Sequence, residues 1–255
     1  MTIENTRFFS TDGLVLGYGT QTVAEDVAFD LALGDVLAVV GHNGSGKTPL
    51  IKTLLGVLKP LAGVLDWSTG RPRTIAYLGQ RTEFDSSFPI RVRDLVVMGT
   101  WPNLGILGRI DGACRARIRE ALERTGTAEI ADVPLDKLSA GQLQLALFAR
   151  TMVQDAPLIL LDEPFSGVDQ TTESALLTLI DDWAAEGRTV ILVLHDLSAV
   201  LRHCTLALLL GDGRARFGAP KETLTPENLV AHKYLSRSQA VWIEDVYFQA
   251  KADDA

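Results

Sequence analysis

A glycine-rich turn that joins an apolar run to a helical pattern constrains this chain of 255 residues more than any other feature. The apolar run covers residues 36–40, the turn reads GHNGSGKT from Gly41 to Thr48, and the helical pattern covers residues 47–57. A buried strand that enters a helix through such a turn is the context of the P-loop, G-x-x-x-x-G-K-[ST]. The feature therefore predicts a strand–turn–helix unit of an α/β protein and a site for phosphate groups.

The residue types in this turn suit a nucleoside triphosphate. Glycines let backbone N–H groups turn toward phosphate oxygens, and the start of the helix adds the positive end of its dipole. Lys47 can reach the β- and γ-phosphates, and Thr48 offers a hydroxyl to Mg²⁺. The alternative is a turn that only connects the strand to the helix. The complete motif in its expected context disfavours this alternative. The predicted phosphate-binding residues are Gly41, His42, Asn43, Gly44, Ser45, Gly46, Lys47 and Thr48.

Composition and charge narrow the class of protein. Hydrophobic residues make up 47% of the chain, enough for a sizeable core, and the net charge of −8 disfavours a nucleic-acid partner. Cys114 and Cys204 lie outside any C-x-x-C spacing, so we expect thiols rather than a disulfide framework or a zinc site. The first residues do not resemble a signal peptide, and no apolar run reaches the roughly 20 residues that span a bilayer. We therefore expect any role at a membrane to depend on a partner.

Strand and helix patterns alternate along most of the chain. Continuous or alternating apolar runs predict strands at residues 23–33, 36–40, 158–161, 189–194 and 206–210. Helical patterns follow at residues 47–57, 142–153, 172–186 and 197–203. This alternation favours an α/β fold with a mostly parallel sheet. Residues 81–154 differ because they lack a convincing strand and contain helical patterns at 93–98 and 113–125, so we expect an inserted helical lobe.

Two acids follow the apolar run at residues 158–161. Ligands of open α/β sheets bind at the carboxyl edge of the strands, where Asp162 and Glu163 are expected to lie. Asp162 there can hold the Mg²⁺ shell, and Glu163 can orient or deprotonate the attacking water. A strand end with two solvated acids is the structural alternative, and the P-loop earlier in the chain favours the catalytic interpretation.

A pentapeptide before this strand, LSAGQ, has two compatible interpretations. Ser139 and Gln142 have the S-x-x-Q spacing of a capping box that opens an ordinary helix. A helix start that contains a glycine is also a phosphate site. The order of P-loop, pentapeptide and strand acids resembles that of the ATP-binding cassette (ABC) ATPases, where the pentapeptide is usually LSGGQ.

The other motifs of that family can be matched in family order over residues 8–235. By resemblance, Tyr18 provides the ring on which adenine stacks, and Gln80 joins two lobes and senses Mg²⁺ and the γ-phosphate. Asp169 resembles the loop that contacts the partner's P-loop, and His195 resembles the switch histidine that contacts the γ-phosphate. Taken singly, such a tyrosine is more often a core residue and such a histidine more often structural, so these assignments depend on position.

The resemblance also implies an architecture and an assembly. It implies a P-loop NTPase (RecA-like) α/β fold with a mostly parallel core sheet, a small antiparallel β portion and an inserted helical subdomain. The implied division is a nucleotide-binding core at 1–80 and 155–235, a helical signature subdomain at 81–154 and a C-terminal tail at 236–255. ATP and Mg²⁺ are the implied cofactors. In a head-to-tail homodimer, one copy would close its pentapeptide over the ATP of the other through Ser139, Gly141 and Gln142.

Two positions depart from the family pattern. Ala140 replaces a glycine, which is tolerated where φ is negative. Pro49 stands where the family usually has serine or threonine, and proline fits the first turn of a helix, where its missing N–H has no helical partner. In the family that N–H and side chain face the α-phosphate, so we expect Pro49 to weaken nucleotide binding.

Residues 80–99 resemble the Gln-loop and following helix of ATPases in the zinc and manganese importer group, with the pattern Phe-Pro-x-x-Val-x-[Asp/Glu]-x-Val-x-Met-Gly. There this region receives a short helix of a membrane permease, and we expect docking near Phe88 to Gly99. The expected apolar socket is Phe88, Pro89, Val92, Val96 and Met98. Alternatively, some of these five residues pack within the core of the helical lobe itself.

The implied function is ATP hydrolysis that drives import of a transition metal, with zinc favoured and manganese next. The protein would lie on the cytoplasmic side of the cell membrane, bound to the permease, and an extracytoplasmic metal-binding protein would act through that permease. Iron-chelate or cobalamin import and export remain alternatives. A soluble ABC ATPase of the ribosome or DNA is disfavoured by the single cassette and the absence of heptads. A purely structural nucleotide-binding module is disfavoured by Asp162, Glu163 and His195.

Overall fold

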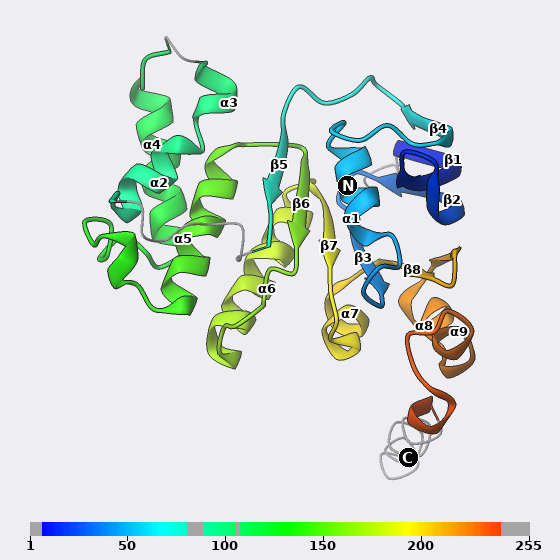
Figure 1. The fold of residues 1–255 in the computed structure, drawn as a ribbon. Coiled ribbons are helices and arrows are strands. Elements are labelled where there is room, and N and C mark those ends of the chain that lie inside the picture. Colours follow the sequence, from blue (N-terminus) through cyan, green and yellow to red (C-terminus); the bar gives the residue numbers. More distant parts are fainter. Residues whose placement is uncertain (1–6, 81–88, 106–107, 241–255) are drawn as a thin grey trace. The chain divides into compact units, whose positions relative to one another are not determined.

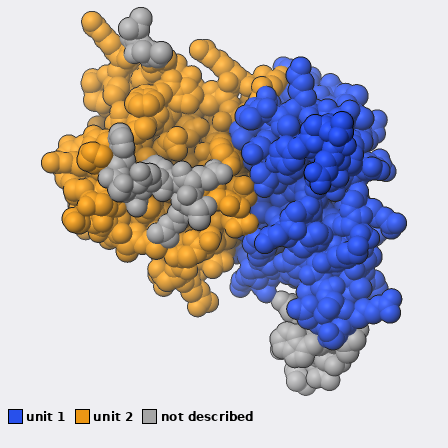
Figure 2. All heavy atoms as spheres, in the orientation of Figure 1, with its two compact units in different colours: residues 1–70, 193–255 blue, residues 71–192 orange. Residues whose placement is uncertain are grey.

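The computed structural model describes residues 7–80, 89–105 and 108–240 (Figure 1). The chain divides into two compact units, which Figure 2 shows in different colours. Unit 1 comprises residues 1–70 and 193–255, and unit 2 comprises residues 71–192. Both contain strands and helices, which confirms the predicted α/β class. Among the described residues, no helix is both long and apolar enough to cross a membrane.

An antiparallel sheet in unit 1 has the order β2-β1-β4. Its strands are β1 (Arg7–Tyr18), β2 (Gln21–Ala32) and β4 (Ala62–Trp67). Phe9, Phe29 and Trp67 pack together, with ring centroids 5.9 Å apart for Phe9–Phe29 and 4.7 Å apart for Phe9–Trp67. This is the small antiparallel portion that the family resemblance implies.

A second group of strands in unit 1 carries the P-loop. β3 (Val36–Gly41) pairs in parallel with β8 (Leu206–Gly211), which pairs antiparallel with β9 (Arg214–Gly218). Every residue of β3 is buried, because the strand is covered on both faces. The helices of this unit are α1 (Lys47–Leu54), α7 (Leu197–His203), α8 (Pro220–Thr223) and α9 (Pro226–Ala231).

Helix α1 ends earlier than the apolar pattern predicts. The expected helix covers residues 47–57, but the helix ends at Leu54 and Leu55 is its C-cap. Gly56 has φ +73°, and its N–H bonds to the carbonyl of Thr53. A glycine in the left-handed region is a common helix stop, and the apolar residues after it belong to the connection to β4.

The strands of unit 2 lie in the order β5-β6-β7. These are β5 (Ile75–Leu78), β6 (Leu158–Asp162) and β7 (Thr189–Val193), and β5 and β6 pair in parallel from Ile75↔Leu158 to Leu78↔Leu161. Helices α5 (Ala140–Val153) and α6 (Gln170–Ala185) pack through Phe148 and Trp183. Their rings are stacked with centroids 5.5 Å apart and planes 11° apart.

The described part of residues 81–154 is helical, as predicted. It contains α2 (Val92–Met98), α3 (Trp101–Leu104), α4 (Gly112–Arg124), the 3₁₀ turn η2 (Leu135–Lys137) and α5. Helices α2, α4 and α5 contact one another and are the green group in Figure 1. The predicted helices at 93–98 and 113–125 are confirmed to within one residue at each end, whereas α3 was not predicted.

Candidate nucleotide site

The P-loop turn in unit 1 is built from close backbone approaches. The N–H of Ser45 donates to the carbonyl of His42 at 3.1 Å, and Gly44 and Gly46 have φ of +83° and +110°. A Cβ on Gly41 would lie 2.3 Å from Ser45 Oγ and 2.4 Å from the Leu210 carbonyl oxygen. The loop therefore requires glycine at these points, and it forms a cradle lined by backbone rather than by side chains.

Polar groups are buried in this cradle. Lys47 is 8% exposed, and its ammonium donates to the carbonyls of Gly41 at 2.6 Å and His42 at 3.0 Å. The Oγ of Ser45 and the Nε2 of His42 are buried and have no hydrogen-bond partner among the described residues. Since buried polar atoms are nearly always hydrogen-bonded, these two atoms fit a site that binds a polar ligand such as a phosphate.

Helix α1 starts at this cradle. Its N-cap is Gly46 in the left-handed conformation, and no side chain among the described residues caps it. Pro49 occupies the third helical position and is buried, while the N–H of Leu50 makes the first helical bond, to the Gly46 carbonyl at 3.0 Å. The expectation that proline fits the first turn is confirmed. The start of α1 presents its positive dipole end to the loop.

Tyr18 ends β1 in the same unit and is 46% exposed, so it is a surface residue rather than a core tyrosine. The ammonium of Lys52, from α1, lies 5.9 Å from the centroid of the Tyr18 ring, within the range of a cation–π contact. An exposed ring at the end of a strand offers a flat apolar face to a base. Sequence patterns do not predict the contact with Lys52.

His195 follows β7 and also belongs to unit 1. The preceding residue, Leu194, donates its N–H to the carbonyl of Val39 in β3 at 3.2 Å. The carbonyl of His195 accepts a hydrogen bond from the Tyr234 hydroxyl at 2.8 Å. The fold therefore connects His195 through the backbone to the strand that enters the P-loop.

The two strand-end acids lie in unit 2. Asp162 is the last residue of β6 and is 6% exposed, and Glu163 follows it in a half-buried position. Glu163 has φ +53°, in the left-handed region that residues other than glycine rarely adopt. Such strain persists only where the surrounding structure holds it, and it concentrates at functional sites.

The pentapeptide of unit 2 forms the predicted capping box. Ser139 Oγ accepts from the N–H of Gln142 at 3.2 Å, and the N–H of Ser139 donates to Gln142 Oε1 at 3.0 Å. Ala140 is the first residue of α5 and has helical φ, so the condition for its tolerance is met. A Cβ on Gly141 would lie 2.7 Å from Thr172 Oγ1, which shows how closely α5 approaches the start of α6.

Asp169 caps helix α6 in the same unit. Its carboxylate accepts from the N–H and the hydroxyl of Thr172, both at 2.9 Å. The bond from the Thr172 backbone is the largest cause that lowers the pKa of Asp169, followed by the bond from its side chain. Gln80 lies two residues after β5 and is half-buried.

The expected apolar socket requires a correction. Val92 and Val96 have exposures of 0% and lie in the core of unit 2, so they cannot contact a permease. Pro89 is exposed and Met98 is half-buried, while Phe88 lies outside the described residues. The reason is helical geometry: Val92 and Val96 are four residues apart, so they lie on the same face of α2, and that face is buried.

These features define a P-loop NTPase, and comparison with known proteins gives the family. The profile of the family described as "ABC transporter" matches residues 24–166. The zinc transport system ATP-binding protein TroB of Treponema pallidum is 39% identical, with 85% of this chain and 83% of TroB covered. The manganese transport system ATP-binding protein MntA of Synechocystis is 34% identical, with 86% and 87% covered.

The chain therefore belongs to the ABC transporter family and is an ABC ATPase. The structure described as "An inward-facing conformation of a putative metal-chelate type ABC transporter" has a TM-score of 0.81 and 31% identity, with 90% of each chain covered. A nucleotide-free ATP-binding cassette with 19% identity and a TM-score of 0.77 shares the fold, with 91% of this chain and 100% of that chain covered. The comparisons confirm the predicted P-loop NTPase fold.

Proposed function

We propose that this ABC ATPase powers the import of a transition metal through a separate membrane permease, with zinc as the cargo and manganese as the next candidate. The observation that carries the proposal is the similarity over most of the chain to ATP-binding proteins named for zinc and manganese transport. The pattern at residues 88–99 supports the same group. The permease would hold the protein on the cytoplasmic side of the membrane, where ATP is available.

ATP would bind with its phosphates in the P-loop cradle. Lys47 would release the carbonyls of Gly41 and His42 and direct its ammonium to the β- and γ-phosphates. The orphaned Ser45 Oγ would donate to a phosphate oxygen, and Tyr18 would stack on adenine. Stacking and charge pairing would together hold both ends of the nucleotide.

Hydrolysis would use the residues that the family resemblance assigns to it. Glu163 would accept a proton from the attacking water, and His195 and Gln80 would contact the γ-phosphate side of the site. Thr48, Gln80 and Asp162 carry hydroxyl, amide and carboxylate oxygens, which Mg²⁺ prefers, so they would hold that ion. Bound Mg²⁺ would neutralise charge that develops on the phosphate oxygens.

A second copy of the chain would complete each site. We propose a nucleotide-binding core at 1–80 and 155–235, a helical subdomain at 81–154 and a tail at 236–255. Ser139, Gly141 and Gln142 of one copy would face the γ-phosphate held by the other, and Asp169 would lie beside the partner's P-loop. Because ATP would contact both copies only in the closed pair, its binding would shift the population toward that pair.

Glu163→Gln tests the catalytic assignment. The substitution keeps the shape and removes the base, so we expect ATP to be bound but not cleaved and the dimer to accumulate with ATP. Size-exclusion chromatography with and without ATP, together with phosphate release, measures both effects. Hydrolysis at the wild-type rate would disprove the role of Glu163.

Reconstitution with the permease in vesicles tests the cargo. We expect the zinc-loaded binding protein to stimulate ATP hydrolysis more than the manganese-loaded form. Stimulation by an iron chelate would instead favour the alternative suggested by similarity to the chelated iron transport protein YfeB of Yersinia pestis, which is 32% identical. ATP hydrolysis that no binding protein stimulates would favour an exporter.

A further inference from the structure

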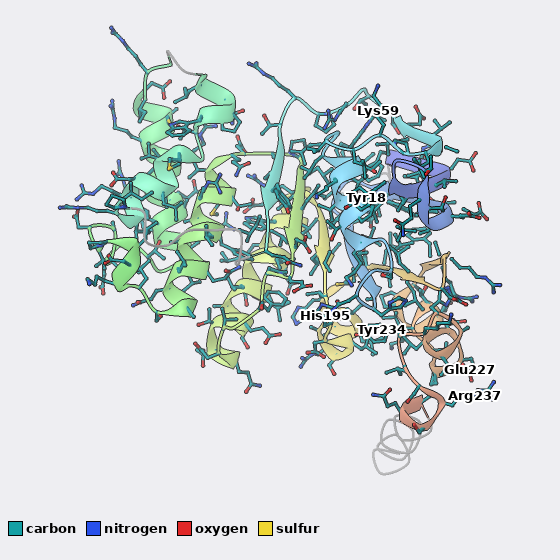
Figure 3. The ribbon with its side chains drawn as sticks, in the orientation of Figure 1. Tyr18, Lys59, His195, Glu227, Tyr234 and Arg237 are labelled. Carbon is teal, nitrogen blue, oxygen red and sulfur yellow. The ribbon has the colours of Figure 1, made fainter. Side chains whose placement is uncertain are left out.

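The segment that follows α9 holds the backbone of His195. The hydroxyl of Tyr234 donates to the carbonyl oxygen of His195 at 2.8 Å, across a separation of 39 positions in the chain. Both residues belong to unit 1, and Figure 3 labels them next to each other. Tyr234 is half-buried, and burial followed by the charge of Asp196 raises the pKa of its hydroxyl. The hydroxyl therefore stays protonated and remains a hydrogen-bond donor at physiological pH.

This segment is itself firmly placed. The N–H groups of Tyr234 and Leu235 bond to the carbonyl of Leu229 at 2.9 and 3.2 Å, and Leu229 is 1% exposed. Lys233 forms an ion pair with Asp212, in the turn between β8 and β9. The backbone of His232 approaches Gly211 so closely that a Cβ on that glycine would clash with it. Tyr234 therefore projects from a platform anchored to β8 and α9.

His195 is held on both sides as well as at its carbonyl. Leu194 is bonded through its N–H to Val39, and Asp196 caps α7 by accepting from the N–H of Ser198 at 2.8 Å. The bond from Tyr234 acts on His195 itself and comes from outside the loop that contains His195. Because the peptide unit is planar, a carbonyl held in one direction restricts the ψ angle of His195 and the φ angle of Asp196, and thus the backbone from which the imidazole projects.

We propose that Tyr234 is a positioning residue for hydrolysis, which holds the backbone of His195 so that the imidazole meets the γ-phosphate. This inference rests on the role of His195 in the proposed function. A small displacement of a catalytic group has a large effect on rate but little on ground-state binding of the nucleotide. Loss of the hydroxyl should therefore appear in kcat rather than in KM.

Tyr234→Phe tests the proposal in the full-length chain, because it removes one oxygen and keeps the ring. We expect kcat for ATP hydrolysis to fall about tenfold while KM for ATP stays within about twofold. Lys233→Ala is the matched control, since it breaks only an exposed ion pair of the same segment, while the backbone bonds of Tyr234 and Leu235 to Leu229 keep the segment docked. Its kcat should stay close to wild type. Thermal unfolding of both variants shows whether the segment remains docked.

A double-mutant cycle with His195→Ala separates this inference from the function on which it rests. If Tyr234 acts through His195, Tyr234→Phe should have no further effect on the residual rate of His195→Ala. An equal fall in kcat in both backgrounds, or wild-type kcat for Tyr234→Phe, would overturn the positioning role. A wild-type rate for His195→Ala would instead remove the proposed role of His195, and the positioning role with it.

Discussion

Helices α1 and α5 are both proposed to meet the phosphates of ATP, yet they begin in different ways. The first turn of α1 follows a glycine in the left-handed conformation, and no side chain among the described residues caps it. The first turn of α5 is closed by the reciprocal bonds of Ser139 and Gln142. If both proposals hold, a helix start can bind an anion in two ways: as an open site that a ligand completes, or as a stable end that presents donors to a partner.

The difference is consistent with the surroundings of each helix. Beside α1, Ser45 and His42 have buried polar atoms without a hydrogen-bond partner among the described residues. At α5, the capping box satisfies Ser139 and Gln142 without any ligand. We therefore expect changes at α1 to act mainly on nucleotide binding and chemistry, and changes at α5 to act on both stability and association.

The largest effect is expected from Lys47→Ala at the open site. Its ammonium is the buried positive charge of the cradle, so its loss should lower kcat by about 10²- to 10³-fold, in the range seen when one transition-state donor is removed. Phosphate release at saturating ATP measures the change. Lys59→Ala, an exposed lysine after α1, is the control and should keep the wild-type rate. If kcat fell by less than about tenfold, hydrolysis would not depend on the charge of Lys47.

Ser139→Ala should act on two properties at once. Loss of the cap should reduce the free energy of unfolding by about 1 kcal/mol. Asp111→Ala is the matched control, because Asp111 caps α4 of the same unit by accepting from the N–H of Cys114 at 2.8 Å. Urea unfolding should show a similar loss for both variants, whereas ATP-dependent dimerisation should weaken only for Ser139→Ala. If both variants dimerised equally well with ATP, Ser139 would act only as a helix cap.

Pro49→Thr should make the open site more complete. The substitution restores an N–H and adds a hydroxyl in the first turn of α1, so ATP should bind more tightly by about 1 kcal/mol, or roughly fivefold. Calorimetric titration with ATP in the Glu163→Gln background avoids hydrolysis during the measurement. Pro49→Ala restores the N–H alone and should give a smaller gain. Unchanged or weaker affinity for Pro49→Thr would show that Pro49 does not limit binding.

The smallest effect concerns Asp169, the cap of α6. Its folded-state pKa lies below its ordinary value because Thr172 donates two hydrogen bonds to the charged form. A lowered pKa stabilises the fold above the unfolded-state pKa, and this contribution is lost as pH falls through the folded-state value. Asp169→Asn should therefore make the free energy of unfolding depend less on pH over the acid range that starts at the ordinary aspartate pKa of about 3.9 and extends below it. Urea unfolding across that range measures the free energy of unfolding at each pH. If its slope against pH were the same in the variant and the wild type, the lowered pKa of Asp169 would be contradicted.

Several elements could be predicted from local patterns alone. The strands β3, β6, β7 and β8 were predicted to within one residue at either end, because each is a continuous apolar run buried on both faces. Strand β1 was not predicted from its pattern. Its pairing with β2 shifts register between Thr11 and Leu14, so buried residues do not alternate regularly.

The candidate site also contains features that local patterns predict and a feature that they do not predict. The P-loop and the capping box depend on residues within a few positions of one another, so their geometry could be read from the sequence and the structure agrees with it. The apolar socket expected on α2 could not be predicted reliably, because no local pattern shows which face of the helix is packed and which remains exposed. The sequence therefore left open which residues of the socket pack in the core, and the structure places Val92 and Val96 there.

The sequence by itself determined the α/β class, the phosphate-binding turn and the family, because glycines, caps and apolar runs act through local backbone geometry. Tertiary structure decided what each exposed residue contacts. It placed Lys52 over the ring of Tyr18, left Ser45 Oγ buried without a partner among the described residues, and set the hydroxyl of Tyr234 against His195. The contacts of Lys52 with Tyr18 and of Tyr234 with His195 join residues far apart in the chain, and packing of whole elements, rather than any local preference, brings them together.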